Sequence, residues 1–113
     1  MTFRGWQEAD AVTAPSARSM RSLLQGTWRD HRGSVYRVSL ADCDHFDAYK
    51  FDVHTMRPDG EELFTKRLIK IEVCHGGVRA FWDSRYLLTR GEECGRLRWA
   101  GHSDRDVFEW HRS

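Results

Sequence analysis

Histidine and cysteine are the residues of this chain best suited to bind a metal ion or to act as a nucleophile. The sequence has six histidines and three cysteines, and five of these residues fall near predicted turns: Cys43, His45, Cys74, His75 and Cys94. Structural zinc sites usually show paired ligands at spacings such as C-x₂₋₄-C and H-x₃₋₅-H, and neither spacing occurs here. A site assembled across several loops stays an alternative, but we expect no metal site and no cofactor.

Two further arrangements could support acid–base or nucleophilic chemistry. His54 could act as a general base, with Asp52 on the same strand face as the carboxylate that orients it. Cys74 and His75 are adjacent, so in a strand they would point in opposite directions. Phosphate loops, Gly-x-Ser-x-Gly and His-Glu-x-x-His are absent. Because a solvated polar face explains His54 and Asp52 without any chemistry, the sequence predicts that the protein is not an enzyme.

The elements that would position these residues follow a two-residue hydrophobic period. Ile69, Ile71 and Val73, for example, alternate with Lys70 and Glu72, which is typical of a strand with one buried face. Turn residues such as Pro-Asp-Gly at 58–60 and Gly-Gly at 76–77 separate the periodic segments. The pattern predicts eight strands, at about 24–30, 34–41, 47–57, 62–73, 77–83, 85–90, 95–100 and 106–112.

One short helix is predicted before the strands, at about residues 15–24. Pro15 suits the first helical position, because its missing N–H costs nothing there. Ala17, Met20, Leu23 and Leu24 follow at spacings of three and four, which places them on one helical face. We therefore divide the chain into an N-terminal arm with a short helix at 1–22 and a single antiparallel β domain at 23–113.

The short connections between strands favour antiparallel neighbours, since parallel pairs need a long crossover. The predicted fold is mainly β: an antiparallel eight-strand meander that forms either a small up-and-down barrel or a strongly curved sheet. Closure removes exposed edges, so the barrel is favoured. The helix would then plug or cover one mouth of the barrel.

A glycine and tryptophan at the start of this domain, and an arginine at its end, carry a family resemblance. Gly26-x-Trp28 opens the first strand, and Arg112 closes the last. This resembles the calycin pattern of lipocalins and fatty-acid-binding proteins, in which the arginine packs over the tryptophan. The resemblance implies an apolar ligand inside the barrel. The β region is short for a calycin, and a barrel filled by its own aromatic side chains remains the alternative.

Two functional hypotheses follow. The first is a non-catalytic protein-interaction module, or a small accessory subunit of a larger assembly. It would dock on other protein subunits through its aromatic N-terminal arm, with Phe3, Trp6 and Met20 as contact residues. The second is a calycin-like carrier of a small apolar ligand. Its lumen would be lined by Trp28, Tyr36, Phe51, Trp82, Trp99 and Arg112.

Charge and cysteine usage limit the remaining classes. The 18 basic and 17 acidic side chains give a net charge of +1, so nucleic-acid binding is disfavoured although arginines alternate with aromatics at 79–82 and 96–99. No apolar run approaches the length of a membrane span. Three cysteines cannot form a complete disulfide framework. This favours an intracellular, reducing compartment, either the cytoplasm or an organelle interior.

Overall fold

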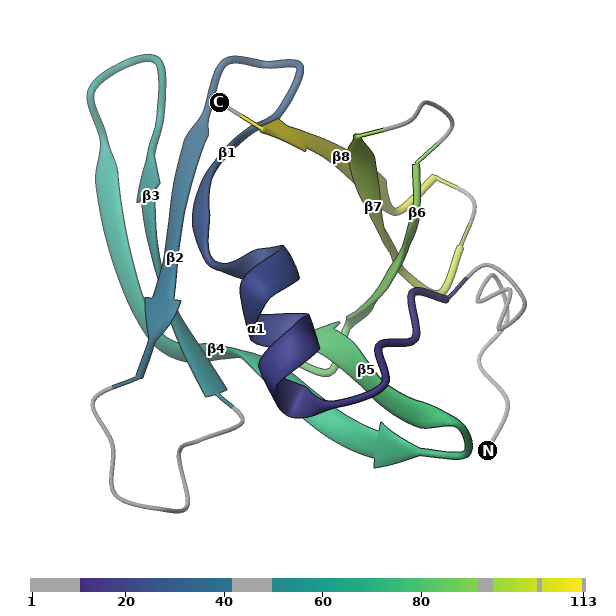
Figure 1. The fold of residues 1–113 in the computed structure, drawn as a ribbon. Coiled ribbons are helices and arrows are strands. Elements are labelled where there is room, and N and C mark those ends of the chain that lie inside the picture. Colours follow the sequence, from purple (N-terminus) through teal and green to yellow (C-terminus); the bar gives the residue numbers. More distant parts are fainter. Residues whose placement is uncertain (1–10, 42–49, 92–94, 104, 113) are drawn as a thin grey trace.

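Eight antiparallel strands and one helix make up the part of the chain that the computed structural model describes, residues 11–41, 50–91, 95–103 and 105–112. The elements are α1 (Ala17–Leu24), β1 (Gly26–Arg29), β2 (Val35–Leu40), β3 (Lys50–Met56), β4 (Glu62–Cys74), β5 (Gly77–Trp82), β6 (Tyr86–Arg90), β7 (Arg96–Ala100) and β8 (Val107–Arg112). Each strand pairs with the next, and β8 pairs with β1 (Figure 1). The predicted fold is thus confirmed, in its closed-barrel form.

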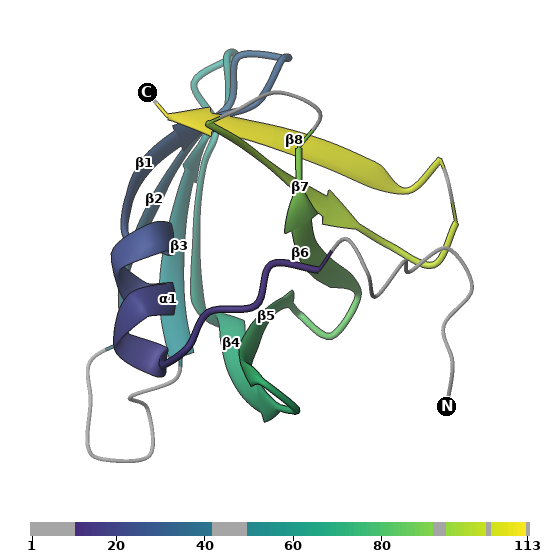
Figure 2. The ribbon, with the colours of Figure 1, turned by 45° about the vertical axis from the view of Figure 1, so that its right-hand side comes forward.

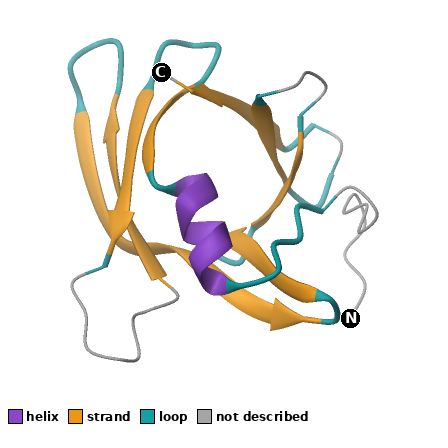
Figure 3. Ribbon diagram, viewed as in Figure 1, coloured by secondary structure: helices purple, strands orange, loops and turns teal. Residues whose placement is uncertain are grey.

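The helix begins later than Pro15. Ser16 is its N-cap, and the Ser16 side chain accepts a hydrogen bond from the backbone N–H of Ser19 at 3.2 Å. A serine hydroxyl satisfies one of the N–H groups that the first helical turn leaves without a partner. Figure 3 shows α1, in purple, set against the orange strands that surround it. Its eight residues end at Leu24, directly before β1.

The hydrophobic core is shared by the helix and the barrel. Met20 and Leu24 of α1 belong to the same buried cluster as Trp28, Trp99 and Trp110. All five side chains are almost completely excluded from solvent. Each large aromatic residue buries roughly 150–250 Å², so three buried tryptophans supply much of the apolar area available to so small a domain.

The extended segment 11–14 completes the wall of the barrel between β5 and β6. These two strands pair directly at only two positions, next to their turn. Beyond it, Val12 donates to the Leu88 carbonyl at 3.0 Å, while Ala14 exchanges backbone hydrogen bonds with Val78 at 3.0 and 2.9 Å. Figure 2 shows the segment crossing from α1 between the two strands. Their backbone groups are thereby satisfied although the strands diverge.

Candidate functional site

The three side chains predicted to contact a partner are not brought together in one described surface. Phe3 and Trp6 lie outside the described residues, so their role stays a prediction. Met20 has 0% exposure and packs in the core. Met20 was predicted to contact a partner because the β core did not account for its side chain. That prediction is wrong, because the apolar face of α1 packs into the barrel. We no longer place Met20 among the partner-contacting residues.

The residues predicted to line the lumen do gather inside the barrel. Trp28, Tyr36 and Trp82 all contact Trp110, with ring centroids 5.6, 5.0 and 5.7 Å from its own. Trp99 lies 5.4 Å from Trp110 in an edge-to-face arrangement. Such contacts at 4.5–7 Å are favourable for aromatic pairs. Phe51 is fully buried in the same core.

Three aromatic members of this cluster, Trp110, Phe108 and Tyr86, are absent from the predicted lining set. Trp110 lies at its centre, and Phe108 contacts both Trp82 and Tyr86, with centroid separations of 5.5 and 5.0 Å. The alternation along 107–111 carried the necessary signal, since Phe108 and Trp110 share a strand face. The aromatic side chains pack against one another inside the barrel, as the filled alternative to a ligand-holding lumen predicts.

The Arg112 side chain connects the last strand to the helix and to the first strand through direct contacts. Its guanidinium lies over the Trp28 ring, 4.1 Å from the centroid. It donates to the backbone carbonyls of Leu23 at 2.6 Å and of Gln25 at 2.9 Å. These carbonyls lie at the C-terminal end of α1, where a cation is favoured by the helix dipole. Gly26 leaves room for this arrangement, because a Cβ there would lie 2.6 Å from an Arg112 nitrogen.

The mouth of the barrel opposite α1 is polar. The Tyr36 hydroxyl donates to Asp30 at 2.8 Å, and the Tyr86 hydroxyl donates to Asp106 at 2.6 Å. Burial, aided by the Asp30 hydrogen bond, raises the pKa of Tyr36 well above its ordinary value. The hydrogen bond to Asp106 is the main cause that raises the pKa of Tyr86. Both phenols therefore keep their protons to a higher pH than an ordinary tyrosine does.

A cavity of about 320 Å³ opens at this mouth. Its lining includes the two tyrosine–aspartate pairs and three arginines, Arg32, Arg57 and Arg105. Arg57 is already paired with Glu61 at 3.0 Å. The volume lies at the lower end of the range of ligand sites, but the polar lining differs from the apolar walls that such sites usually have. This cavity does not fit the apolar ligand that the calycin resemblance implies.

His54 and Asp52 do not form the pair that a general base would need. His54 Nε2 lies 3.0 Å from Glu62 Oε1, and its ring stacks on Phe64 with a centroid separation of 4.0 Å. Asp52 instead accepts the backbone N–H of Arg67 at 2.9 Å. Each side chain has a structural role in joining β3 to β4.

The metal hypothesis is tested only in part. Within the described ranges, no group of three or more histidine, cysteine, aspartate or glutamate side chains is placed to hold a metal ion. Cys74 is a free thiol at the end of β4. Cys43, His45 and Cys94 lie outside the described residues, so the expectation of no loop-built site stays a prediction.

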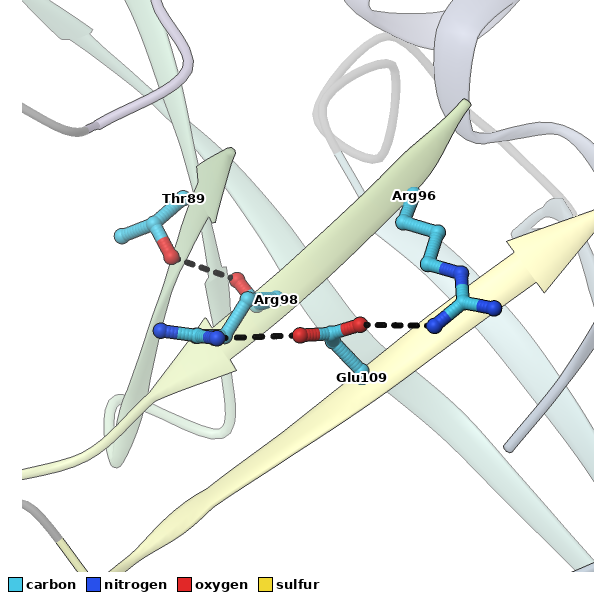
Figure 4. Close-up of polar contacts among 4 residues, drawn as sticks. All are labelled: Thr89, Arg96, Arg98 and Glu109. Atoms are coloured by element: carbon cyan, nitrogen blue, oxygen red, sulfur yellow. Dashed lines mark hydrogen bonds and ion pairs between the residues drawn. The ribbon is translucent and has the colours of Figure 1, made fainter. Parts of the chain in front are cut away.

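Arginines alternate with aromatic residues along β7, so the two kinds of side chain lie on opposite faces of the strand. Figure 4 shows Glu109 of β8 between two arginines of β7. Glu109 lies 3.0 Å from Arg98 and 3.6 Å from Arg96, while Thr89 donates to the Arg98 carbonyl at 3.0 Å. Trp99 points the other way and is fully buried. It therefore offers no face on which a nucleotide base could stack.

An open strand edge is the strongest candidate interface on the described surface. β4 pairs with β5 only from Ile69 to Cys74, whereas its first part, from Glu62 to Thr65, pairs with β3. Among the described residues, the ladders give residues 62–66 no strand on the β5 side. This stretch carries two exposed apolar side chains, Leu63 at 41% and Phe64 at 76%. Unpaired backbone groups next to apolar side chains are a template for strand pairing.

A bulge opens this edge. The β3–β4 register shifts between Phe51 and Val53, whose partners are Ile69 and Thr65. The shift accommodates extra β4 residues, among them Arg67, which has a φ of 56°. The Asp52 carboxylate accepts the Arg67 N–H and so supports this uncommon backbone. Bulges bend a strand and increase its twist, and here the bulge separates the part of β4 that meets β5 from the part that does not.

No protein-family model, curated protein sequence or solved structure matches this chain. The calycin resemblance thus stays a prediction. No helix among the described residues is long and apolar enough to cross a membrane.

Proposed function

We propose that the protein is a non-catalytic protein-interaction module that binds a partner strand along residues 62–66 of β4. The observation that supports this proposal is the edge itself. Its residues are exposed, they have a described neighbour strand on one side only, and they include Leu63 and Phe64. In the left part of Figure 1 the β3–β4 hairpin stands at the margin of the barrel.

Strand addition suits this edge for two physical reasons. Alternate residues of an edge strand direct their N–H and C=O groups away from the sheet, so an added strand gains a ladder of hydrogen bonds. Successive side chains point to opposite faces, so Phe64 and Leu63 would give the partner a contact on each face of the enlarged sheet. Hydrogen bonds would supply affinity, and these two side chains would supply specificity.

The proposal of a non-catalytic role has separate support. Asp52, the carboxylate predicted to orient His54 as a general base, instead accepts the Arg67 backbone N–H, and the His54 ring stacks on Phe64. The arm with Phe3 and Trp6 remains a predicted second contact. We also retain the prediction of a reducing, intracellular compartment, with which the free thiol of Cys74 is consistent.

The proposal is tested by purifying tagged full-length protein from its own source and measuring the mass of the native complex. Phe64→Lys places a charge on the edge and should remove a co-purifying chain. Val73→Lys is the matched control, because Val73 is 79% exposed on the same strand but lies beside β5. Loss of the partner from both variants or from neither would refute docking at residues 62–66.

Carriage of an apolar ligand is a second candidate, favoured by one observation. The indole nitrogens of Trp99 and Trp110 are buried and have no hydrogen-bond partner. A buried donor without an acceptor costs about 1–3 kcal/mol, and an oxygen atom of a small ligand would relieve this cost. Titration with a fluorescent fatty acid tests the idea. Saturable quenching of tryptophan emission is expected of a carrier, and a linear response contradicts it.

A further inference from the structure

The open edge carries a negative charge before Phe64 and a positive charge at the same distance after it. Glu62 lies two positions before Phe64, and Lys66 lies two positions after it. All three side chains are exposed. The even spacing puts them on one face of β4, since side chains alternate along a strand. The segment thus presents, on one face, a negative charge, an aromatic ring and a positive charge in equal steps.

We propose that the partner strand at this edge is the same strand of a second copy of the chain. The two β4 strands would run antiparallel, related by a two-fold axis that passes Phe64. This inference rests on the proposed function, because it uses the same edge and identifies its occupant. It would join the two barrels through one continuous sheet, with the same surface used by both copies.

The two-fold axis at Phe64 brings complementary residues opposite each other. Glu62 of each copy faces Lys66 of the other, and Leu63 faces Thr65. Directly opposed side chains of an antiparallel pair have Cβ atoms about 4.5–5.5 Å apart. Each dimer therefore gains two ion pairs of opposite charge and no opposition of like charges within residues 62–66.

Three neighbouring registers lack this match. An axis at Leu63 would set Glu62 against the apolar ring of Phe64. An axis at Thr65 would set Lys66 against that ring, and an axis between residues 64 and 65 would set Lys66 against Leu63. A one-residue slip also moves side chains to the wrong face of the sheet. Of these four arrangements, the axis at Phe64 is the one that pairs both charges.

The ring of Phe64 is already held in place for such a contact. It stacks on His54 of β3 with an interplanar angle of 9°, and His54 is itself held by Glu62. In the dimer the two phenylalanine rings would be cross-strand neighbours. A row of four rings would then run across the four central strands, with one His54 at each end. Aromatic cross-strand pairs stabilise sheets.

The contact is short. The hairpin turn at residues 57–60 precedes the open stretch, and the bulge at Arg67 follows it. A ladder of five residues per strand is near the usual length of a strand in globular proteins. It covers less area than a permanent dimer interface usually does. We therefore expect reversible dimerisation that depends on protein concentration.

Charge exchange tests the proposed register. Sedimentation velocity over a concentration series of the full-length chain should show a monomer–dimer equilibrium. Lys66→Glu sets like charges opposite each other twice per dimer, and should raise the dissociation constant about tenfold. Glu62→Lys should do the same. The double variant E62K/K66E restores both pairs and should return the constant to within about threefold of the original.

A control and several outcomes make the test decisive. Lys70→Glu changes the same charge on the same strand where β4 pairs with β5, and should leave the equilibrium unchanged. Glu62→Lys and the double variant lose the native His54–Glu62 contact, whereas Lys66→Glu keeps it. Near-ultraviolet circular dichroism of each monomer is therefore compared first. Failure of the double variant to recover dimerisation overturns the inference.

The remaining outcomes separate this inference from the proposed function. A wild-type chain that stays monomeric at high concentration, yet loses a different co-purifying protein in Phe64→Lys, overturns self-pairing and leaves the interaction module standing. A dimer that Phe64→Lys and Lys66→Glu leave intact uses another surface, and overturns self-pairing at this edge. A monomer with no partner sensitive to Phe64→Lys overturns both.

Discussion

Replacement of Arg112 by methionine should weaken the barrel where its last strand meets its first. Among the described residues, β1 and β8 pair at two positions, Trp28 with Arg112 and Arg29 with His111. The Arg112 side chain supplements this short ladder with two hydrogen bonds to carbonyls at the C-terminal end of α1 and a cation–π contact with Trp28. Methionine keeps much of the aliphatic length and removes all three polar interactions.

The expected loss follows from these contacts. Because Arg112 is exposed, each of its two hydrogen bonds is counted at about 1 kcal/mol, the usual net value, below the roughly 1.5–3 kcal/mol of a hydrogen bond to a charged group. The cation–π contact contributes about 0.5–1 kcal/mol at an exposed position. The free energy of unfolding should therefore fall by about 2–3 kcal/mol. Arg112→Lys keeps the charge without the planar fork, and should lose about half as much.

Urea unfolding followed by tryptophan fluorescence measures this change, with the free energy taken from the midpoint at constant slope. Arg57→Met is the control, because Arg57 has one exposed ion pair, 3.0 Å from Glu61. Such a pair is worth about 0–1 kcal/mol. If Arg112→Met destabilises the protein no more than Arg57→Met does, Arg112 does not fasten the barrel and the reasoning is wrong.

Three further changes should give distinct results. Gly26→Ala should destabilise the protein by about 1–3 kcal/mol in the same assay, because φ is +127° and the new methyl group would meet Arg112. Gly77→Ala should loosen segment 11–14, whose Ala14 carbonyl occupies the position of the new Cβ, and faster proteolysis before α1 would report it. Tyr36 has a pKa raised above its ordinary 10.0, so the unfolded chain loses this proton first and stability falls as pH rises above that value. Tyr36→Phe should reduce this alkaline loss while costing about 1 kcal/mol at neutral pH; unchanged alkaline loss would contradict the assignment.

Much of the fold could be predicted because its signals are local. A period of two along residues 62–73 and Gly-Gly at 76–77 predict a hairpin, and the structure has β4 at Glu62–Cys74 and β5 at Gly77–Trp82. Closure was harder to predict, since the β1–β8 contact involves residues far apart in sequence. The same holds for segment 11–14, whose strand-like pairing with Val78 and Leu88 no local pattern indicates.

The open edge could have been found by comparing strand lengths. A strand predicted at 62–73 lies beside one predicted at 77–83, and the longer one must leave several residues unpaired. The bulge that produces this edge has no signal of its own, because Arg67 takes a positive φ that usually belongs to glycine or asparagine. Its support comes from Asp52 on the neighbouring strand, a tertiary contact that propensities do not contain. Met20 was misplaced for a related reason, since its burial depends on where α1 packs.

Aromatic side chains pack inside this barrel, so its surface is the better candidate for a functional site. A closed sheet removes unpaired edges, and large aromatic side chains pack inside this barrel. Trp28, Trp99 and Trp110 use that space for the core. Closure leaves an open edge, the stretch of β4 before Arg67. There the bulge turns the strand away from β5. Among the described residues, that stretch has no strand on the β5 side and carries an exposed Phe64, the combination that a second strand can satisfy.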